Sequence, residues 1–126
     1  MCMGAAKRRV LVIDDDRPCR ELLCEALEDE GYEVRGATNG RAGLAVLRDW
    51  RPDLIVLDLV MPDMDGLAFQ SKQRGNGFAD IPVLLLSAAR DLAAQAEALG
   101  LSALSKPFQL DELLEQVDGL TSRRAG

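Results

Sequence analysis

The sequence contains no histidine among its 126 residues. This excludes chemistry that depends on an imidazole: Ser-His-Asp and Cys-His catalysis, zinc sites with histidine ligands, and a phosphohistidine carried by this chain. The side chains that remain for chemistry are carboxylates, hydroxyls and amines.

Cysteine is scarce as well, and the three residues Cys2, Cys19 and Cys24 form no C-x-x-C pair. Cys19 and Cys24 are five residues apart on one expected helix. Their side chains therefore point about 140° apart, and a disulfide between them would require broken helix geometry. The pattern is typical of a reduced, cytosolic protein. We interpret Cys19 as a small core residue rather than a redox sensor.

Long apolar runs and extended basic patches are also missing. No stretch approaches the roughly 18 apolar residues needed to span a bilayer, and the basic start leads into a strand rather than a signal peptide. Acidic residues outnumber basic ones by 21 to 15, which gives a net charge of −6. We interpret the basic clusters Lys7–Arg9 and Arg123–Arg124 as solvated termini. We expect a cytoplasmic protein that contacts neither a membrane nor nucleic acid directly.

The chain does contain five short apolar runs that alternate with amphipathic stretches, the pattern of a βα repeat with a parallel sheet. We therefore expect an α/β fold, a doubly wound five-stranded parallel sheet with helices on both faces. The expected strands are Val10–Ile13, Glu33–Ala37, Leu54–Leu57, Ile81–Leu86 and Ala103–Ser105. The expected helices are Arg17–Glu30, Gly40–Trp50, Gly66–Arg74, Leu92–Leu99 and Leu110–Leu120. Gly31 predicts a left-handed backbone after the first helix.

Reactive side chains follow the strong strands. Asp14, Asp15 and Asp16 come after the first strand, Asp58 after the third, Ser87 after the fourth, and Lys106 after Ser105 at the end of the fifth. The carboxyl ends of parallel strands share one edge of the sheet, so these groups converge in one crevice. Crowded carboxylates repel one another, and a hard cation such as Mg²⁺ relieves that repulsion.

These groups suit phosphoryl transfer. Asp58 can attack a phosphorus atom as a nucleophile. Mg²⁺ and the Lys106 ammonium can neutralise charge on the equatorial oxygens, and the Ser87 hydroxyl can donate to one of them. The product is an acyl phosphate on Asp58.

Simpler structural roles exist for each of these residues. Asp14 to Asp16 alone could form a solvated turn that caps the first helix, and Asp58 could cap the end of its strand. Their occurrence together with Lys106 favours a reactive site. Asp63 and Asp65 are better explained as turn residues than as metal ligands.

Four segments in order carry a resemblance to a known family: Val10–Asp16, Pro52–Gly66, Ile81–Ala88 and Ser105–Phe108. The chain resembles the receiver domain of bacterial response regulators, the phosphoacceptor half of two-component signalling. The resemblance implies a flavodoxin-like fold with strand order 2-1-3-4-5. It also implies one receiver domain over residues 1–126, with a core at about residues 8–120, and no output domain. Such a protein is not an enzyme beyond the phosphorylation and dephosphorylation of its own aspartate.

The resemblance also assigns roles at the metal site. Asp58 is the phosphoacceptor and a ligand of Mg²⁺ or Mn²⁺. Asp15 is a direct ligand, Asp14 binds through water, and the backbone carbonyl of Val60 completes the protein ligands.

Other implied roles concern switching and partners. The Ser87 hydroxyl moves toward the phosphoryl group, while Lys106 pairs with it and is aimed inward by a cis peptide before Pro107. The donor is a sensor histidine kinase or a phosphotransfer protein. An unidentified downstream protein reads the face formed by helix Leu92–Leu99, the fifth strand and the last helix. We also consider a weak homodimer.

The sequence departs from the family at the switch. Ala103 stands three residues before Lys106, where receivers usually carry an aromatic residue, and the interval from Ser87 to Lys106 is about one helical turn short. An alternative is therefore a pseudo-receiver, an interaction module that acts without phosphorylation. A phosphatase of the haloacid dehalogenase type would carry a carboxylate two residues after its nucleophile, and Val60 stands there instead.

We predict slow loss of the phosphoryl group from the isolated protein. In this family the positions two residues beyond the phosphoacceptor and the switch hydroxyl hold or exclude the attacking water. Val60 and Ala89 occupy these positions, and neither side chain can orient water. Labelled phosphoprotein should keep its label after the donor is removed, and rapid loss would contradict the prediction.

Overall fold

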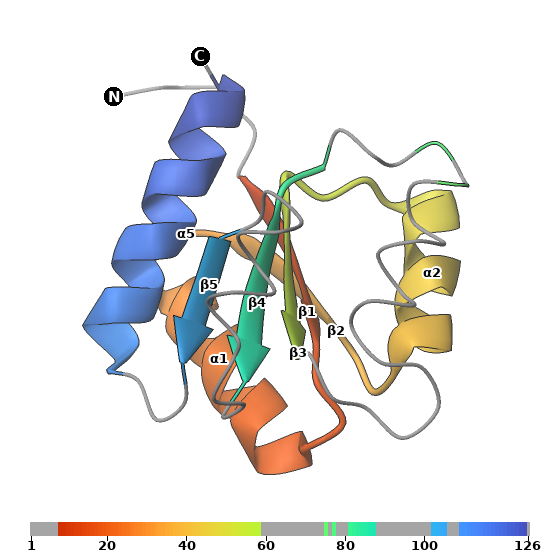
Figure 1. The fold of residues 1–126 in the computed structure, drawn as a ribbon, viewed down its shortest axis with the longest axis horizontal. Coiled ribbons are helices and arrows are strands. Elements are labelled where there is room, and N and C mark those ends of the chain that lie inside the picture. Colours follow the sequence, from red (N-terminus) through yellow and green to blue (C-terminus); the bar gives the residue numbers. More distant parts are fainter. Residues whose placement is uncertain are drawn as a thin grey trace.

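The computed structural model of the chain describes residues 8–58, 75, 77, 81–87, 102–105 and 109–125. Five parallel strands form one sheet in the order β2-β1-β3-β4-β5 (Figure 1). The strands are β1 (Arg9–Ile13), β2 (Glu33–Ala37), β3 (Leu54–Asp58), β4 (Val83–Ser87) and β5 (Ser102–Ser105). The described helices are α1 (Arg17–Asp29), α2 (Gly40–Asp49) and α5 (Leu110–Ala125). The expected strand order is confirmed.

Helices cover both faces of the sheet, with α2 on one side and α1 and α5 on the other (Figure 1). Alternate residues of the central strands point to opposite faces, which is why these strands are apolar throughout. The α2-side cluster consists of Leu11, Ile13, Ala37, Leu47, Trp50, Ile55, Leu57, Ile81, Val83 and Leu85. The α1/α5-side cluster consists of Val10, Val12, Leu23, Leu27, Tyr32, Leu54, Val56, Leu84, Leu86, Leu113 and Val117.

The ends of α1 follow from local sequence. Asp16 caps the first turn, because its side chain accepts a hydrogen bond from the Cys19 N–H at 3.2 Å. At the other end Gly31 has φ 97°, which confirms its expected left-handed backbone. The Gly31 N–H donates to the Glu28 carbonyl at 3.0 Å, and the Tyr32 N–H donates to the Leu27 carbonyl at 3.1 Å. This pair of bonds is a Schellman motif.

Several boundaries differ from the expected ones. Helix α5 extends to Ala125 instead of Leu120. Thr121 continues the buried stripe of this helix, and its hydroxyl donates to the Val117 carbonyl at 2.8 Å, so a polar residue serves as a core position. Strand β4 begins at Val83, two residues later than expected, and includes Ser87. The expected helices at 66–74 and 92–99 lie outside the described residues. None of the described helices combines the length and apolar character needed to cross a membrane.

The amino edge of the sheet is held together around Trp50. The indole is 4% exposed, and its Nε1–H donates to a Glu33 carboxylate oxygen at 3.0 Å. The guanidinium of Arg35 lies 4.9 Å from the centre of the indole ring, and that of Arg9 lies 5.5 Å away. Both distances suit cation–π attraction. The Arg9 N–H also donates to the Asp53 side chain at 2.9 Å, which links β1 to the start of β3.

Cys19 and Cys24 are not joined by a disulfide, and both are half-buried against the α1/α5-side cluster. Burial raises the pKa of the Cys24 thiol, and the negative charges of Glu28 and Glu21 raise this pKa further. Cys24 therefore stays protonated at neutral pH and is a poor nucleophile.

We predict that Leu27→Ala lowers the free energy of unfolding by about 2–5 kcal/mol, because the side chain is fully buried and its removal leaves a cavity. Urea unfolding followed by the fluorescence of buried Trp50 measures this change. Leu22→Ala is the matched control on the same helix. Leu22 is 52% exposed, so its truncation should cost less than about 0.5 kcal/mol. Equal losses in the two variants would contradict the assigned packing of α1.

Candidate functional site

The described polar residues that the sequence predicts for the site lie at the carboxyl ends of the strands. Asp14 directly follows β1, and Asp58 is the last residue of β3. Strand β4 ends at Ser87 and β5 at Ser105, and these two residues are register partners. Because the strands are parallel, all four positions lie at the edge marked by the arrowheads in Figure 1.

Three carboxylates meet at this edge. Asp14, Asp15 and Asp58 each contribute one oxygen, and the three oxygens lie within 4.8 Å of one another. Asp14 is 1% exposed and Asp58 is 9% exposed, whereas Asp15 is open to solvent. The cluster therefore has a buried floor and one accessible side.

This acidic cluster fits a hard divalent cation. Mg²⁺ binds oxygen ligands at about 2.1 Å, so two oxygens on one ion lie at most about 4.2 Å apart. The three Asp oxygens are within 4.8 Å of one another, so small side-chain rotations bring them to that spacing. Their shared negative charge opposes this approach unless a cation is bound.

The turn between β1 and α1 fixes the most buried of these residues. The Asp14 N–H donates to the Ala37 carbonyl on β2 at 3.2 Å. One carboxylate oxygen of Asp14, Oδ1, accepts a hydrogen bond from the Asp16 N–H at 3.0 Å. The Asp16 side chain serves as the helix cap and is not a member of the cluster. Of the three consecutive aspartates, two therefore belong to the cluster and the third starts α1.

Other predicted site residues lie outside the described part of the chain. These are Val60 with its carbonyl, Lys106, and the turn residues Asp63 and Asp65. Ser87 is described only by its backbone at the end of β4. The roles assigned to these residues, and the division of direct and water-mediated metal contacts between Asp15 and Asp14, stay predictions.

The position of the missing aromatic residue lies inside β5. Ala103 is half-buried and packs against the α2-side cluster, with Leu85 of β4 as its register partner. Its methyl group has no rotamer to change, so this position offers no side-chain rotation that could couple the site to the surface.

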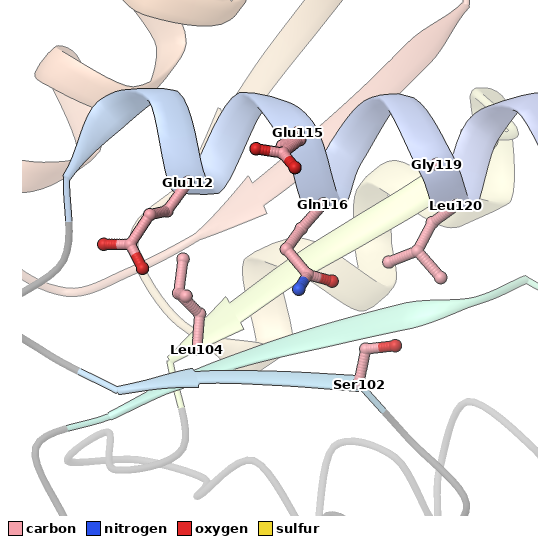
Figure 2. A pocket seen from close by; sticks show the side chains of 7 residues that line it. All are labelled: Ser102, Leu104, Glu112, Glu115, Gln116, Gly119 and Leu120. Atoms are coloured by element: carbon pink, nitrogen blue, oxygen red, sulfur yellow. The ribbon is translucent and has the colours of Figure 1, made fainter.

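A groove lies between β5 and α5, on the face that the family resemblance assigns to signalling. Figure 2 shows side chains from both elements lining it. Its volume is about 320 Å³. Leu104 and Leu120 give it apolar walls, and Glu112 and Glu115 make its helix side acidic. The remaining lining residues are Ser102, Gln116 and Gly119.

Comparisons with known proteins agree with this geometry. The family model described as "Response regulator receiver domain" matches residues 10–118. Response regulator MprA of Mycolicibacterium vanbaalenii is 41% identical over 118 residues, which cover 91% of this chain and 51% of that protein. MprA of Mycobacterium tuberculosis gives the same identity and coverage. The chain thus spans about half the length of these curated relatives.

Solved structures share the fold. The receiver domain of the Francisella response regulator 1452 is 31% identical, with a TM-score of 0.85 over 94% of this chain and 99% of that one. The chemotaxis protein CheY4 of Vibrio cholerae is also 31% identical, with a TM-score of 0.81 over 91% of this chain and 99% of that one. The sheet order, the acidic edge and the family match lead to one conclusion: the chain belongs to the response regulator receiver domain family.

Proposed function

We propose that this receiver domain accepts a phosphoryl group on Asp58 from a phosphohistidine on a sensor kinase or phosphotransfer protein. The observation that carries the proposal is the position of Asp58. It ends the fully buried strand β3, and one of its carboxylate oxygens lies within 4.8 Å of oxygens of Asp14 and Asp15. A reactive carboxylate beside a pair of further carboxylates is the arrangement that metal-assisted phosphoryl transfer requires.

In the proposed reaction an Asp58 carboxylate oxygen attacks the phosphorus atom, and the P–N bond to the donor imidazole breaks. The bonding electron pair leaves with the imidazole, and the product is an acyl phosphate on Asp58. Bound Mg²⁺ or Mn²⁺ supplies the positive charge that lets an anionic phosphoryl group approach an acidic cluster. Asp14 and Asp15 hold that ion, while Ser87 and Lys106 contact the phosphoryl oxygens in the roles that the family implies.

The proposed output surface is the β5/α5 groove together with the predicted helix 92–99, which lies outside the described residues. A downstream protein binds there after Asp58 is phosphorylated. In this proposal the receiver domain acts in the cytoplasm, and it catalyses only the phosphorylation and dephosphorylation of its own aspartate.

One observation favours a second candidate function. Ala103 packs against the core where receivers usually carry a mobile aromatic ring. A pseudo-receiver that binds its partner in the same way with or without phosphate would need no such ring. The groove between β5 and α5 would then be a constitutive binding surface.

Incubation with acetyl phosphate and Mg²⁺ should add one phosphoryl group to the intact protein, measured by mass spectrometry. Asp58→Asn should take up none, because an amide is not a nucleophile toward phosphorus. Asp49→Asn is the matched control, since Asp49 is an exposed acid at the end of α2. It should be labelled like the wild type. Wild-type protein that gains no phosphoryl mass would favour the pseudo-receiver.

Neutralising the exposed member of the acidic cluster should stabilise the metal-free protein. In EDTA, Asp15→Asn should raise the free energy of unfolding by on the order of 0.5 kcal/mol, a value reduced by solvent screening. The reason is the loss of repulsion between the Asp15 carboxylate and the carboxylates of Asp14 and Asp58, whose oxygens lie within 4.8 Å of it. Excess Mg²⁺ should stabilise the wild type more than Asp15→Asn, because only the wild type keeps all three carboxylates.

Urea unfolding with and without Mg²⁺ measures both effects. Asp49→Asn removes one negative charge elsewhere and controls for the net charge of −6. A Mg²⁺ response equal in Asp15→Asn and in the wild type would contradict a metal site that includes Asp15.

A further inference from the structure

Asp14 is held by hydrogen bonds from three parts of the fold. Its N–H reaches β2 through the Ala37 carbonyl, and its Oδ1 is held by the Asp16 N–H within the turn. Its backbone carbonyl accepts a hydrogen bond from Nη1 of Arg20 on α1 at 2.8 Å. The first bond comes from backbone pairing with the neighbouring strand and the second from the turn itself. The third comes from a side chain six residues further along the chain.

Arg20 reaches Asp14 along a slot in β2 that exists because residue 36 is a glycine. A Cβ at Gly36 would lie 3.3 Å from Cδ and 3.4 Å from Cγ of Arg20, and 3.4 Å from Sγ of Cys24. Among the described residues the glycines with positive φ are Gly31 and Gly77, so the backbone at Gly36 accepts other residues. The Cβ distances are slightly tighter than ordinary van der Waals contact, so a side chain at position 36 would push the Arg20 stem aside by a few tenths of an ångström.

The Arg20 bond acts on the peptide unit that joins Asp14 to Asp15. A hydrogen bond from a guanidinium to a carbonyl is charge-assisted and restrains the plane of that peptide. The orientation of this plane sets the direction in which the Asp15 side chain leaves the backbone. It therefore sets where the Asp15 carboxylate stands relative to Asp14 and Asp58, whose oxygens lie within 4.8 Å of it.

We propose that Arg20, seated in the slot over Gly36, is a positioning residue of the acidic site: its bond to the Asp14 carbonyl orients Asp15 for metal binding. This inference rests on the proposed function, because it assumes that the cluster binds a divalent cation. Removal of a group that hydrogen-bonds to a metal ligand and orients it commonly lowers metal affinity by about 10- to 100-fold.

The positive charge of Arg20 offers a competing explanation, which substitution can separate from positioning. Lysine keeps the charge, but its ammonium ends one bond short of Nη1 and lacks the planar fork. Methionine keeps the unbranched apolar stem over Gly36 and removes both charge and donor. Positioning requires that Arg20→Lys and Arg20→Met both weaken Mn²⁺ binding. A pure charge effect would leave Arg20→Lys like the wild type and would make Arg20→Met bind Mn²⁺ more tightly, because a positive charge near the site repels the cation.

The experiment measures Mn²⁺ affinity by the electron paramagnetic resonance signal of free Mn²⁺ during titration of the intact protein. We expect about tenfold weaker binding for both Arg20→Lys and Arg20→Met. Arg17→Met is the matched control. Arg17 lies on the same helix, but its guanidinium is exposed and pairs with Glu21 at 2.9 Å. This control should bind within about twofold of the wild type.

A second route tests the slot without changing Arg20. Gly36→Ala places a methyl group against the Arg20 stem and should weaken Mn²⁺ binding several-fold while the protein stays folded. Gly75→Ala is its control, because an added Cβ there meets nothing within 4 Å. Urea unfolding followed by Trp50 fluorescence verifies that each variant is folded.

The outcomes separate the two proposals. If wild-type protein neither binds Mn²⁺ nor takes up a phosphoryl group, the proposed function fails. If wild type binds Mn²⁺ and Arg20→Met binds equally well, or Arg20→Lys matches the wild type while Arg20→Met does not, the positioning role of Arg20 is overturned. Loss of affinity in both Arg20 variants and in Gly36→Ala, with both controls unchanged, supports it.

Discussion

Repulsion among carboxylates at one edge of a parallel sheet is the constraint on which the rest of this molecule depends. The central strands β1 and β3 are buried on both faces, and their carboxyl ends lie at one edge of the sheet. Asp14 and Asp58 therefore cannot move apart without breaking β1 or β3. The apolar strands supply the burial energy that keeps this acidic edge folded. In the proposed function, a cation or a phosphoryl transfer complex would meet a site whose charges are already in position, which is the preorganisation that catalysis of this kind needs.

The two edges of the sheet divide the structural and chemical roles. At the amino edge Trp50 is held by Glu33 and faces the guanidinium groups of Arg9 and Arg35, so charge there is paired with opposite charge or with an aromatic ring. At the carboxyl edge acids are grouped with acids. The paired charges at the amino edge stabilise the fold without a ligand, whereas the repulsion at the carboxyl edge would be relieved by a bound cation. A ligand that binds the acidic edge thus changes the stability of the strand ends most directly.

Local sequence predicted most of the fold, because the signals are short in range. Apolar runs define the strands, Asp16 and Gly31 define the ends of α1, and parallel topology brings Asp14 and Asp58 together. The predicted end of α5 at Leu120 was wrong. Thr121 is a polar residue in the sequence, but its hydroxyl donates a hydrogen bond within the helix, so the residue can be buried there. Arg20 was missed for a different reason. Its contact with Asp14 depends on how α1 crosses β2 above Gly36, and no spacing within one element encodes that crossing.

Strand β5 offers a route from the acidic edge to the groove that does not need an aromatic ring. Its end residue Ser105 is paired with Ser87 of β4, and the next residue inward, Leu104, lines the groove against α5. Ala103 faces the opposite side and packs into the core. In the proposed function, a displacement of the Ser87 backbone toward a phosphorylated Asp58 would be transmitted through the β4/β5 pairing to Leu104, one residue away from Ser105. In the proposed receiver, the small residue at 103 makes strand movement, rather than ring rotation, the means by which the site reaches its surface.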